Sequence, residues 1–446
     1  MLLHRWRVHP ARSQIDMRLL AICIAVTLGG DWAERPPGAS PVIPADPIPA
    51  SYFGLHIHRA VSTLRFPQAA VWPSVGFAGW RLWDAGVAWP QLEPSPGTWH
   101  FDELDHYVAL ADSHHVEILL TLALSPTWAS ARPEEPSGYA AGNAAEPKSM
   151  TDWRDYVRTV ATRYRGRIRQ YEIWNEPNLK QFFTGDIETM VRLVAVADTV
   201  LKEVDSNNVL VSPPATTYRG VRWLDAFLAA GGGRYVDVIG FHFYVSPQPP
   251  EAMAPLIDSV WAIIHRNNLD RKPLWNSETG WFIANRETLV APVGTGNDFR
   301  SKVLTDSEAS AYVARAFTIA WAHNVRRFYW YAWDNTAMGL TEADGQKAKA
   351  PATAYSVIHD WLVGRQMISC RPDSTGTWVA DLIPPQGGHE FLVWRPQGLQ
   401  VFPVAGYVGV AYLRDLKNGG RALTAAERTK GVVVGPLPLL LQTHKS

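Results

Sequence analysis

The segment IRQYEIWNEPN, residues 168–178, places Asn-Glu-Pro directly after a short apolar run typical of a β-strand. Pro177 cannot donate to a strand ladder, so the run ends at Glu176. In barrels of parallel strands, the active site is built where the strands end at their carboxyl side. Asn175 and Glu176 are therefore the first candidates for chemistry, provided that the rest of the chain folds in that way.

From residue 51 onward, short apolar runs alternate with longer stretches of helical periodicity, as in parallel α/β folds. No Gly-rich phosphate turn follows the first run, which argues against a doubly wound sheet. The pattern predicts an α/β fold, a (β/α)8 TIM barrel, over residues 51–364. The eight expected strands are 52–59, 79–84, 116–122, 168–176, 208–213, 236–244, 273–278 and 326–333.

The regions on either side of the expected barrel differ from it in hydrophobic pattern and in composition. Residues 365–446 consist of short alternating runs cut by Gly and Pro, which predicts a small C-terminal all-β, sandwich-like domain. Residues 1–50 hold an apolar run with a basic start, followed by a Pro-rich linker. The run is too short for a stable membrane span. We therefore expect an export signal and a secreted or periplasmic protein, with only weak support for a lipid anchor at Cys23.

The charge balance narrows the class of partner. The 446 residues contain 42 Lys and Arg against 42 Asp and Glu, so no net field attracts nucleic acid or an acidic membrane. Two cysteines are too few for a disulfide framework. Twenty tryptophans are many for this length, and indole rings stack well on sugar rings. A neutral partner such as a carbohydrate fits these numbers best.

Glu278 ends the seventh expected strand, in the segment WNSETGW, nearly across the barrel from Glu176. Glycoside hydrolysis requires such a pair, because one carboxyl group protonates the departing oxygen while the other stabilises or attacks the anomeric carbon. A negative charge at Glu278 and partial desolvation should raise the pKa of Glu176. Arg81 and the Tyr244 hydroxyl should favour the ionised form of Glu278. We expect Glu176 to be the acid/base and Glu278 the nucleophile.

Four motifs carry a resemblance to a known family: WNEP, HFY, SETGW and a Trp, at the ends of expected strands four, six, seven and eight. Together they resemble the retaining β-glycoside hydrolases of clan A, above all glycoside hydrolase family 39 and next family 5. The resemblance implies hydrolysis of O-glycosidic bonds in an oligo- or polysaccharide, without a metal or cofactor. It also implies substrate-binding roles for a set of residues, to which Trp residues after strand ends are added as candidate stacking platforms: His58, Arg81, Asn175, His242, Tyr244, Trp333, Trp281 and Trp128.

Two other classes of protein compete with this hypothesis. His56 and His58 lie two apart on a strand and could bind a divalent ion in an amidohydrolase-type barrel. Such a site also needs a histidine after strand five and a lysine on strand four, which the sequence lacks, although His242 and Asp334 are present. The second alternative is a noncatalytic carbohydrate-binding barrel, which has no use for the two glutamates. The hydrolase hypothesis expects His58 to face the substrate and His56 to be structural.

Two loops at the expected carboxyl edge are long and polar, residues 125–149 and 282–305. Long loops at this edge usually shape the substrate cleft. We expect them to wall a groove for an oligosaccharide or polysaccharide rather than a pocket for one sugar.

Overall fold

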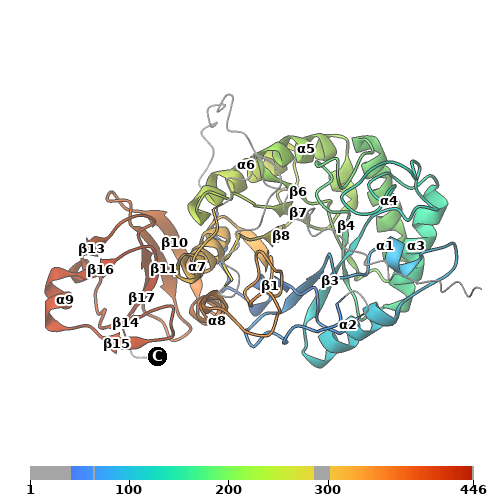
Figure 1. Ribbon diagram of the computed structural model, residues 1–446. Helices are drawn as coiled ribbons and strands as arrows, with labels where there is room; N and C mark the ends of the chain where they lie inside the picture. The colour runs from blue at the N-terminus through green and yellow to red at the C-terminus, as the bar shows by residue number, and fades with distance from the viewer. Residues whose placement is uncertain (1–41, 64–65, 286–301, 444–446) are drawn as a thin grey trace, which may run out of the picture.

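The computed structural model describes residues 42–63, 66–285 and 302–443, and Figure 1 shows a barrel beside a smaller β-domain. All strand pairs of the barrel are parallel. Its strands are β1 (Phe53–His56), β2 (Gly79–Leu82), β3 (Glu117–Leu122), β4 (Gln170–Ile173), β5 (Val209–Val211), β6 (Ala215–Thr216), β7 (Ile239–His242), β8 (Leu274–Thr279) and β9 (Val325–Trp330).

Segments β5 and β6 are two halves of the fifth barrel strand, separated by Pro213 and Pro214. Proline has no N–H group to donate, so the strand ladder is interrupted there. β5 pairs with β4, and β6 pairs with β7. Val211 of β5 also bridges to Val238, just before β7, and the backbone N–H of Ser212 donates to the Val238 carbonyl at 2.9 Å. The sheet closes on itself, and the predicted eight-stranded barrel is confirmed.

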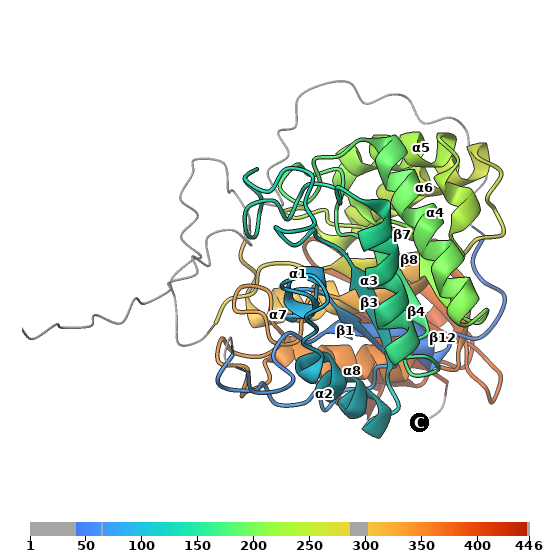
Figure 2. The ribbon, with the colours of Figure 1, turned by 90° about the vertical axis from the view of Figure 1, so that its right-hand side faces the viewer.

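The barrel helices lie outside the strands, and Figure 2 shows α3 and α4 over β3 and β4. Side-chain caps start three of them, α3, α4 and α7. Ser149 accepts from the backbone of Thr151 and Asp152 at α3, and Thr305 forms a capping box with Glu308 at α7. The helices are α1 (Trp89–Leu92), α2 (Asp102–Ser113), α3 (Met150–Arg163), α4 (Ile187–Val204), α5 (Thr217–Ala229), α6 (Met253–Arg266), α7 (Asp306–Ala322) and α8 (Ala350–Leu362).

The C-terminal part is built from antiparallel strands and confirms the predicted all-β domain. The predicted boundary at residue 364 lies between α8 and the first of these strands. A six-stranded sheet has the order β10 (Gln366–Pro372), β11 (Trp378–Ile383), β12 (Glu390–Trp394), β17 (Leu439–Gln442), β14 (Tyr412–Arg414) and β15 (Gly420–Ala422). A second pair is formed by β13 (Gln400–Phe402) and β16 (Val432–Val434), and α9 (Ala425–Lys430) precedes β16.

A half-buried carboxylate, that of Glu251, joins the two parts. Glu251 accepts from Arg315 Nε on α7 at 2.8 Å and from the Trp394 indole on β12 at 2.7 Å. Helix α7 is buried along almost its whole length because it packs against both α8 and β10. Its nearly continuous apolar sequence suits such an environment. The C-terminal domain is thus anchored to the barrel wall by polar and apolar contacts.

Two sequence predictions fall partly or wholly outside the described residues. The expected export signal and Cys23 lie within residues 1–41, and much of the second expected cleft loop lies within residues 286–301. Among the helices of the described ranges, none is both long enough and apolar enough to cross a bilayer.

Candidate active site

The two glutamates predicted to be catalytic meet at the carboxyl edge of the barrel. Glu278 lies in β8, and Glu176 lies three residues beyond β4. Only 1% of Glu176 and 7% of Glu278 is exposed, and a carboxylate oxygen of one lies within 4.8 Å of a carboxylate oxygen of the other. The backbone of Glu176 has φ of +42°, a region that non-glycine residues rarely occupy and that recurs at functional sites.

Arg81 of β2 is completely buried beneath this pair and serves three partners. Its Nη1 donates to Glu278 Oε2 at 2.7 Å, and its Nε donates to Glu172 Oε2 at 2.7 Å. Its Nη2 donates to Asn175 Oδ1 at 2.8 Å. The carbonyl oxygen of Asn175 therefore faces Arg81, and its N–H groups are directed away from the guanidinium. One positive charge organises two carboxylates and orients one amide.

The pKa of Glu278 differs from the sequence-based expectation, because the influences that raise it are stronger than those that lower it. The Tyr244 hydroxyl donates to Oε1 at 2.9 Å, and both this bond and Arg81 favour the ionised form, as the sequence predicted. Burial nevertheless raises the pKa of Glu278 to about 8, because desolvation and the charges of Glu176 and Asp84 outweigh the two donors. In the free site this carboxyl group therefore holds its proton more tightly than an ordinary glutamate.

Glu176 is paired with a neutral histidine. His242 Nδ1 lies 3.0 Å from Glu176 Oε1, and the imidazole is completely buried. Burial and the positive charge of Arg81 hold the pKa of His242 well below its usual range. His242 Nε2 has no hydrogen-bond partner among the described residues. The pair therefore shares one hydrogen atom between Nδ1 and Oε1 without adding a positive charge to the site.

The two histidines of β1 and its end lie beside each other, as strand alternation predicts, and both contact the Tyr331 ring edge-on at 5.0 and 5.1 Å. His56 Nε2 lies 2.9 Å from the Ser277 carbonyl oxygen. His58 Nδ1 lies 3.2 Å from Asp334 Oδ1, which also accepts from the His58 backbone. The imidazole of His56 is thus held by a backbone carbonyl, whereas that of His58 is held by a carboxylate side chain.

This arrangement does not favour the metal-dependent alternative. Within the described ranges, the side chains whose potential ligand atoms converge are Glu176, His242 and Glu278. That group includes neither His56 nor His58, on which the amidohydrolase hypothesis depends. One ring nitrogen of each of these histidines is instead engaged, His56 Nε2 by a backbone carbonyl and His58 Nδ1 by Asp334.

Three predicted tryptophan platforms require correction or remain untested. Trp333 is 1% exposed, and its indole N–H donates to the Val71 carbonyl at 2.6 Å. Trp281 is 0% exposed and stacks on Trp330 in the core between barrel and helices. Neither ring presents a free face, because each continues the hydrophobic core. Trp128 is half-buried and donates to the Glu93 carbonyl at 2.9 Å.

Tyr331 and Asp84 are near the site and escaped the sequence analysis. Tyr331, rather than Trp333, contacts the histidines and packs in one cluster with Tyr244. Asp84, just beyond β2, accepts from the Tyr139 hydroxyl at 2.6 Å and from the Tyr331 hydroxyl at 3.3 Å. Asp84 ends the run GWRLWD, so its position at a strand end was the available signal.

Known proteins are similar to this chain in sequence and in fold. Residues 78–268 match the family model described as glycosyl hydrolases family 39. A β-xylosidase of Caldicellulosiruptor saccharolyticus is 34% identical over 113 residues, which are 23% of this chain and 22% of that protein. A family 39 glycoside hydrolase of Bacteroides cellulosilyticus WH2 has a TM-score of 0.67 at 18% identity, over 88% of this chain and 80% of the other. Residues 78–268 belong to glycoside hydrolase family 39.

The family 39 region confirms the resemblance predicted from the motifs. A second β-xylosidase, from Geobacillus stearothermophilus, is 28% identical over 166 residues, 31% of this chain and 33% of that protein. The alignments with these two relatives thus span less than two thirds of either relative. The family 39 match contains Arg81 and Glu176 but ends before β8. The role of Glu278 therefore depends on its geometry.

Proposed function

We propose that the chain is a retaining glycoside hydrolase in which Glu278 is the nucleophile and Glu176 the acid/base. The observation that carries the proposal is the approach of the two buried carboxylates to within 4.8 Å at the carboxyl edge of the barrel. In retaining enzymes the two groups are about 5–5.5 Å apart, and in inverting enzymes about 6.5–9.5 Å, because a water must fit between them. The short separation supports double displacement.

In the first step, an ionised Glu278 attacks the anomeric carbon while the bond from that carbon to the departing oxygen breaks. Glu176 gives its proton to this oxygen, and a glycosyl ester on Glu278 results. In the second step, a water molecule attacks the same carbon and passes a proton to Glu176. The ester bond breaks, Glu278 regains its charge, and the sugar leaves with its original anomeric configuration.

The residues around the pair fit these roles. Arg81 and Tyr244 hold the two oxygens of Glu278 in place for attack. When His242 Nδ1–H donates to Glu176 Oε1, the acid proton of Glu176 is confined to Oε2, which directs the proton transfer. Asn175, turned by its bond to Arg81, can donate its amide hydrogens to a sugar hydroxyl.

The substrate proposed is a β-linked oligo- or polysaccharide, with β-xylosides as the first to test because two sequence relatives are β-xylosidases. We also propose export, on the strength of the apolar run in residues 17–30. A screen of aryl β-glycosides and β-linked polysaccharides with purified protein tests the activity. Turnover of none of them by wild-type protein would contradict the proposal.

Glu176→Ala should slow natural glycosides by about 10²–10⁴-fold, the usual contribution of a general acid. Aryl glycosides with good leaving groups need no protonation, so their first step should be nearly unchanged. Azide, a nucleophile that needs no general base, should restore turnover of these substrates. Rates on paired substrates with leaving groups of different pKa measure the effect. An equal loss on good and poor leaving groups would show that Glu176 is not the acid.

Tyr244→Phe should move the acidic limb of the kcat/KM profile to higher pH and lower kcat by about 10-fold. The lost hydroxyl lowers the pKa of Glu278, so its removal raises that pKa. Because the nucleophile must be ionised, activity then appears only in more alkaline solution. Tyr156→Phe is the control, since that buried hydroxyl has no partner within the described residues. An unshifted limb in folded Tyr244→Phe would exclude the proposed contact.

A further inference from the structure

Arg81 divides its contacts unequally between two carboxylates. Glu172 Oε2 lies 2.7 Å from Nε and 2.5 Å from Nη2, so Glu172 occupies the edge of the guanidinium that offers two donors to one carboxylate. Glu278 Oε2 receives a hydrogen bond from Nη1 at 2.7 Å. The proposed nucleophile therefore shares its cation with a second carboxylate, and that carboxylate holds the larger part of the contacts.

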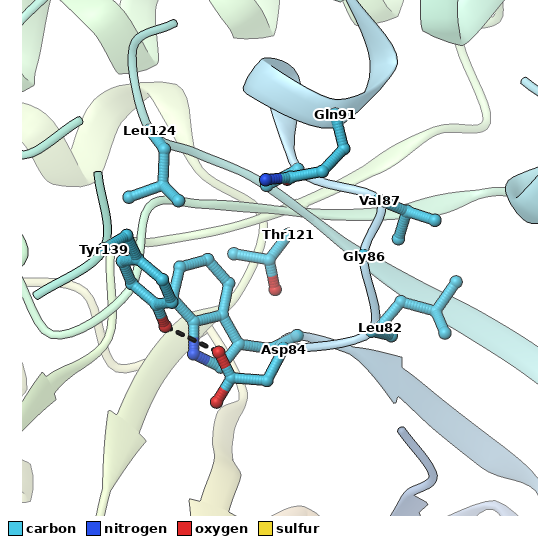
Figure 3. Close-up of a pocket in the computed structure, with 11 residues that line it drawn as sticks. Leu82, Asp84, Gly86, Val87, Gln91, Thr121, Leu124 and Tyr139 are labelled. Atoms are coloured by element: carbon cyan, nitrogen blue, oxygen red, sulfur yellow. Dashed lines mark hydrogen bonds between the residues drawn. The ribbon is translucent and has the colours of Figure 1, made fainter. Parts of the chain in front are cut away.

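Glu172 is completely buried in β4 and depends on few donors. Besides Arg81, Thr121 Oγ1 on β3 donates to its Oε2 at 3.1 Å. Figure 3 shows Thr121 among the residues that line a small pocket, together with Asp84. The other oxygen, Oε1, has no hydrogen-bond partner among the described residues. Burial raises the pKa of Glu172, while Arg81 and Thr121 lower it. The ionised form of Glu172 thus relies mainly on Arg81.

The other groups around Glu278 offer it no positive charge. The Tyr244 hydroxyl donates to Oε1, and the charges of Glu176 and Asp84 raise the pKa of Glu278. Within the described ranges, the salt bridge of Glu278 is with Arg81. The degree to which Arg81 is neutralised from its other side therefore matters directly to Glu278.

The histidines on the neighbouring strands add no positive charge either. Burial, reinforced by the positive charge of Arg81, holds the pKa of His56 on β1 and of His242 on β7 well below the usual range. On β8, Ser277 contributes a neutral hydroxyl, which lowers the pKa of Glu172. One guanidinium thus serves two buried carboxylates.

A negative charge beside a carboxyl group raises the pKa of that group, because ionisation would bring two like charges together. Glu172 and Glu278 contact the same guanidinium, so their charges act on each other through the poorly solvated interior of the barrel. Removal of the charge of Glu172 would leave Arg81 to Glu278 alone. Glu278 would then ionise more readily and would be a weaker base and nucleophile.

We propose that Glu172 is a positioning residue that divides the charge of Arg81 and thereby sets the pH at which Glu278 ionises. It acts through Arg81 rather than on the substrate. This inference rests on the proposed function, because it assigns a role toward the proposed nucleophile.

Glu172→Gln tests this inference, since Gln keeps the shape of the side chain and removes its charge. The acidic limb of the kcat/KM profile on an aryl glycoside should move to lower pH by about one unit, opposite to the shift expected for Tyr244→Phe. Glu172→Met, also uncharged, should move the limb in the same direction. Glu172→Asp keeps the charge in a shorter side chain, so it should disturb packing but move the limb less. Glu203→Gln, on the exposed surface of α4, should not move it.

The same shift can be measured without substrate. Chemical denaturation between about pH 5 and about pH 9 gives the free energy of unfolding of the wild type and of Glu278→Gln, and the pH dependence of their difference reports the pKa of Glu278. The stability that the raised pKa adds is lost as the pH rises through about 8. When both proteins also carry Glu172→Gln, this loss should occur about one pH unit lower.

The outcomes separate this inference from the proposed function. A shifted stability profile in a protein that hydrolyses no glycoside would support the role of Glu172 and contradict the hydrolase. Active wild-type protein, with an unmoved limb and an unmoved stability profile in folded Glu172→Gln and Glu172→Met, would overturn the role of Glu172 alone. A limb that moves to higher pH in these variants would overturn it as well, and so would lower activity at every pH with no shift.

Discussion

Replacement of Glu278 by Gln should lower kcat by on the order of 10⁴- to 10⁶-fold, as for removal of other covalent nucleophiles. Gln has nearly the same shape, so the contacts with Arg81 and Tyr244 can be largely retained. An amide cannot form the glycosyl ester, and the loss should therefore appear with every leaving group. The measurement is kcat on an activated aryl glycoside and on a natural oligosaccharide.

The stability of Glu278→Gln distinguishes lost chemistry from lost folding. The pKa of Glu278 is raised to about 8 from the ordinary value of 4.5. The raised pKa therefore adds to the free energy of unfolding of the wild type. This added stability is complete below pH 4.5 and is lost as the pH rises through about 8. Gln does not titrate, so the variant does not lose stability in this pH range, and its melting temperature above pH 8 should equal or exceed that of the wild type.

Glu188→Gln on the surface of α4 is a matched control that should keep full activity. A Glu278→Gln protein that is folded and active would contradict the role of Glu278.

Arg81→Met should lower the free energy of unfolding by about 3–5 kcal/mol, because it removes one partner from a buried ion pair. The guanidinium is 0% exposed and donates to Glu172, which is also 0% exposed. Without Arg81, burial raises the pKa of Glu172 with no opposing cation, and that of Glu278 rises too. Chemical denaturation near neutral pH measures the change in stability, and an aryl glycoside measures the expected loss of activity.

The double variant Arg81→Met with Glu172→Gln provides the rescue. It removes the carboxylate that the single variant leaves without a partner, so part of the stability should return. Activity should not return, because Glu278 and Asn175 still lack their donor. A single variant as stable as the wild type would show that the charge of Arg81 does not hold the base of the site together.

The architecture could be predicted from the sequence because each barrel strand is a short apolar run bounded by polar segments. All eight expected strands overlap an observed one, although the fifth is split at Pro213 and Pro214. Strand ends also identified Glu176 and Glu278, since parallel strands bring their carboxyl ends to one edge. His242 and Tyr244, two apart on the sixth strand, were placed on one face by alternation, and they contact Glu176 and Glu278 respectively.

The aromatic residues show where pattern recognition fails. The segment from Tyr329 to Trp333 contains four aromatic side chains, and all four are buried. Which of them faces the site depends on where the regular strand ends, and β9 ends at Trp330. The ring of Tyr331 therefore contacts the two histidines, while the indole N–H of Trp333 donates to the Val71 carbonyl.

Two acidic residues were missed for different reasons. Glu172 lies inside β4, and its alternation with Gln170 on one face of the strand was the signal for a polar barrel interior. Its importance follows from Arg81, on another strand, which no local pattern connects to it. Asp84 acquires its role from Tyr139 in the long loop after β3, a contact 55 residues apart in sequence.

The most direct test follows the anomeric configuration of fresh product by proton NMR, on whichever glycoside the screen shows to be cleaved. Wild-type protein should first release the β-anomer from a β-glycoside, because two displacements at one carbon restore the original configuration. The α-anomer should appear only later, by mutarotation. Initial release of the α-anomer would mean a single displacement by water, and it would contradict the assignment of Glu278 as nucleophile.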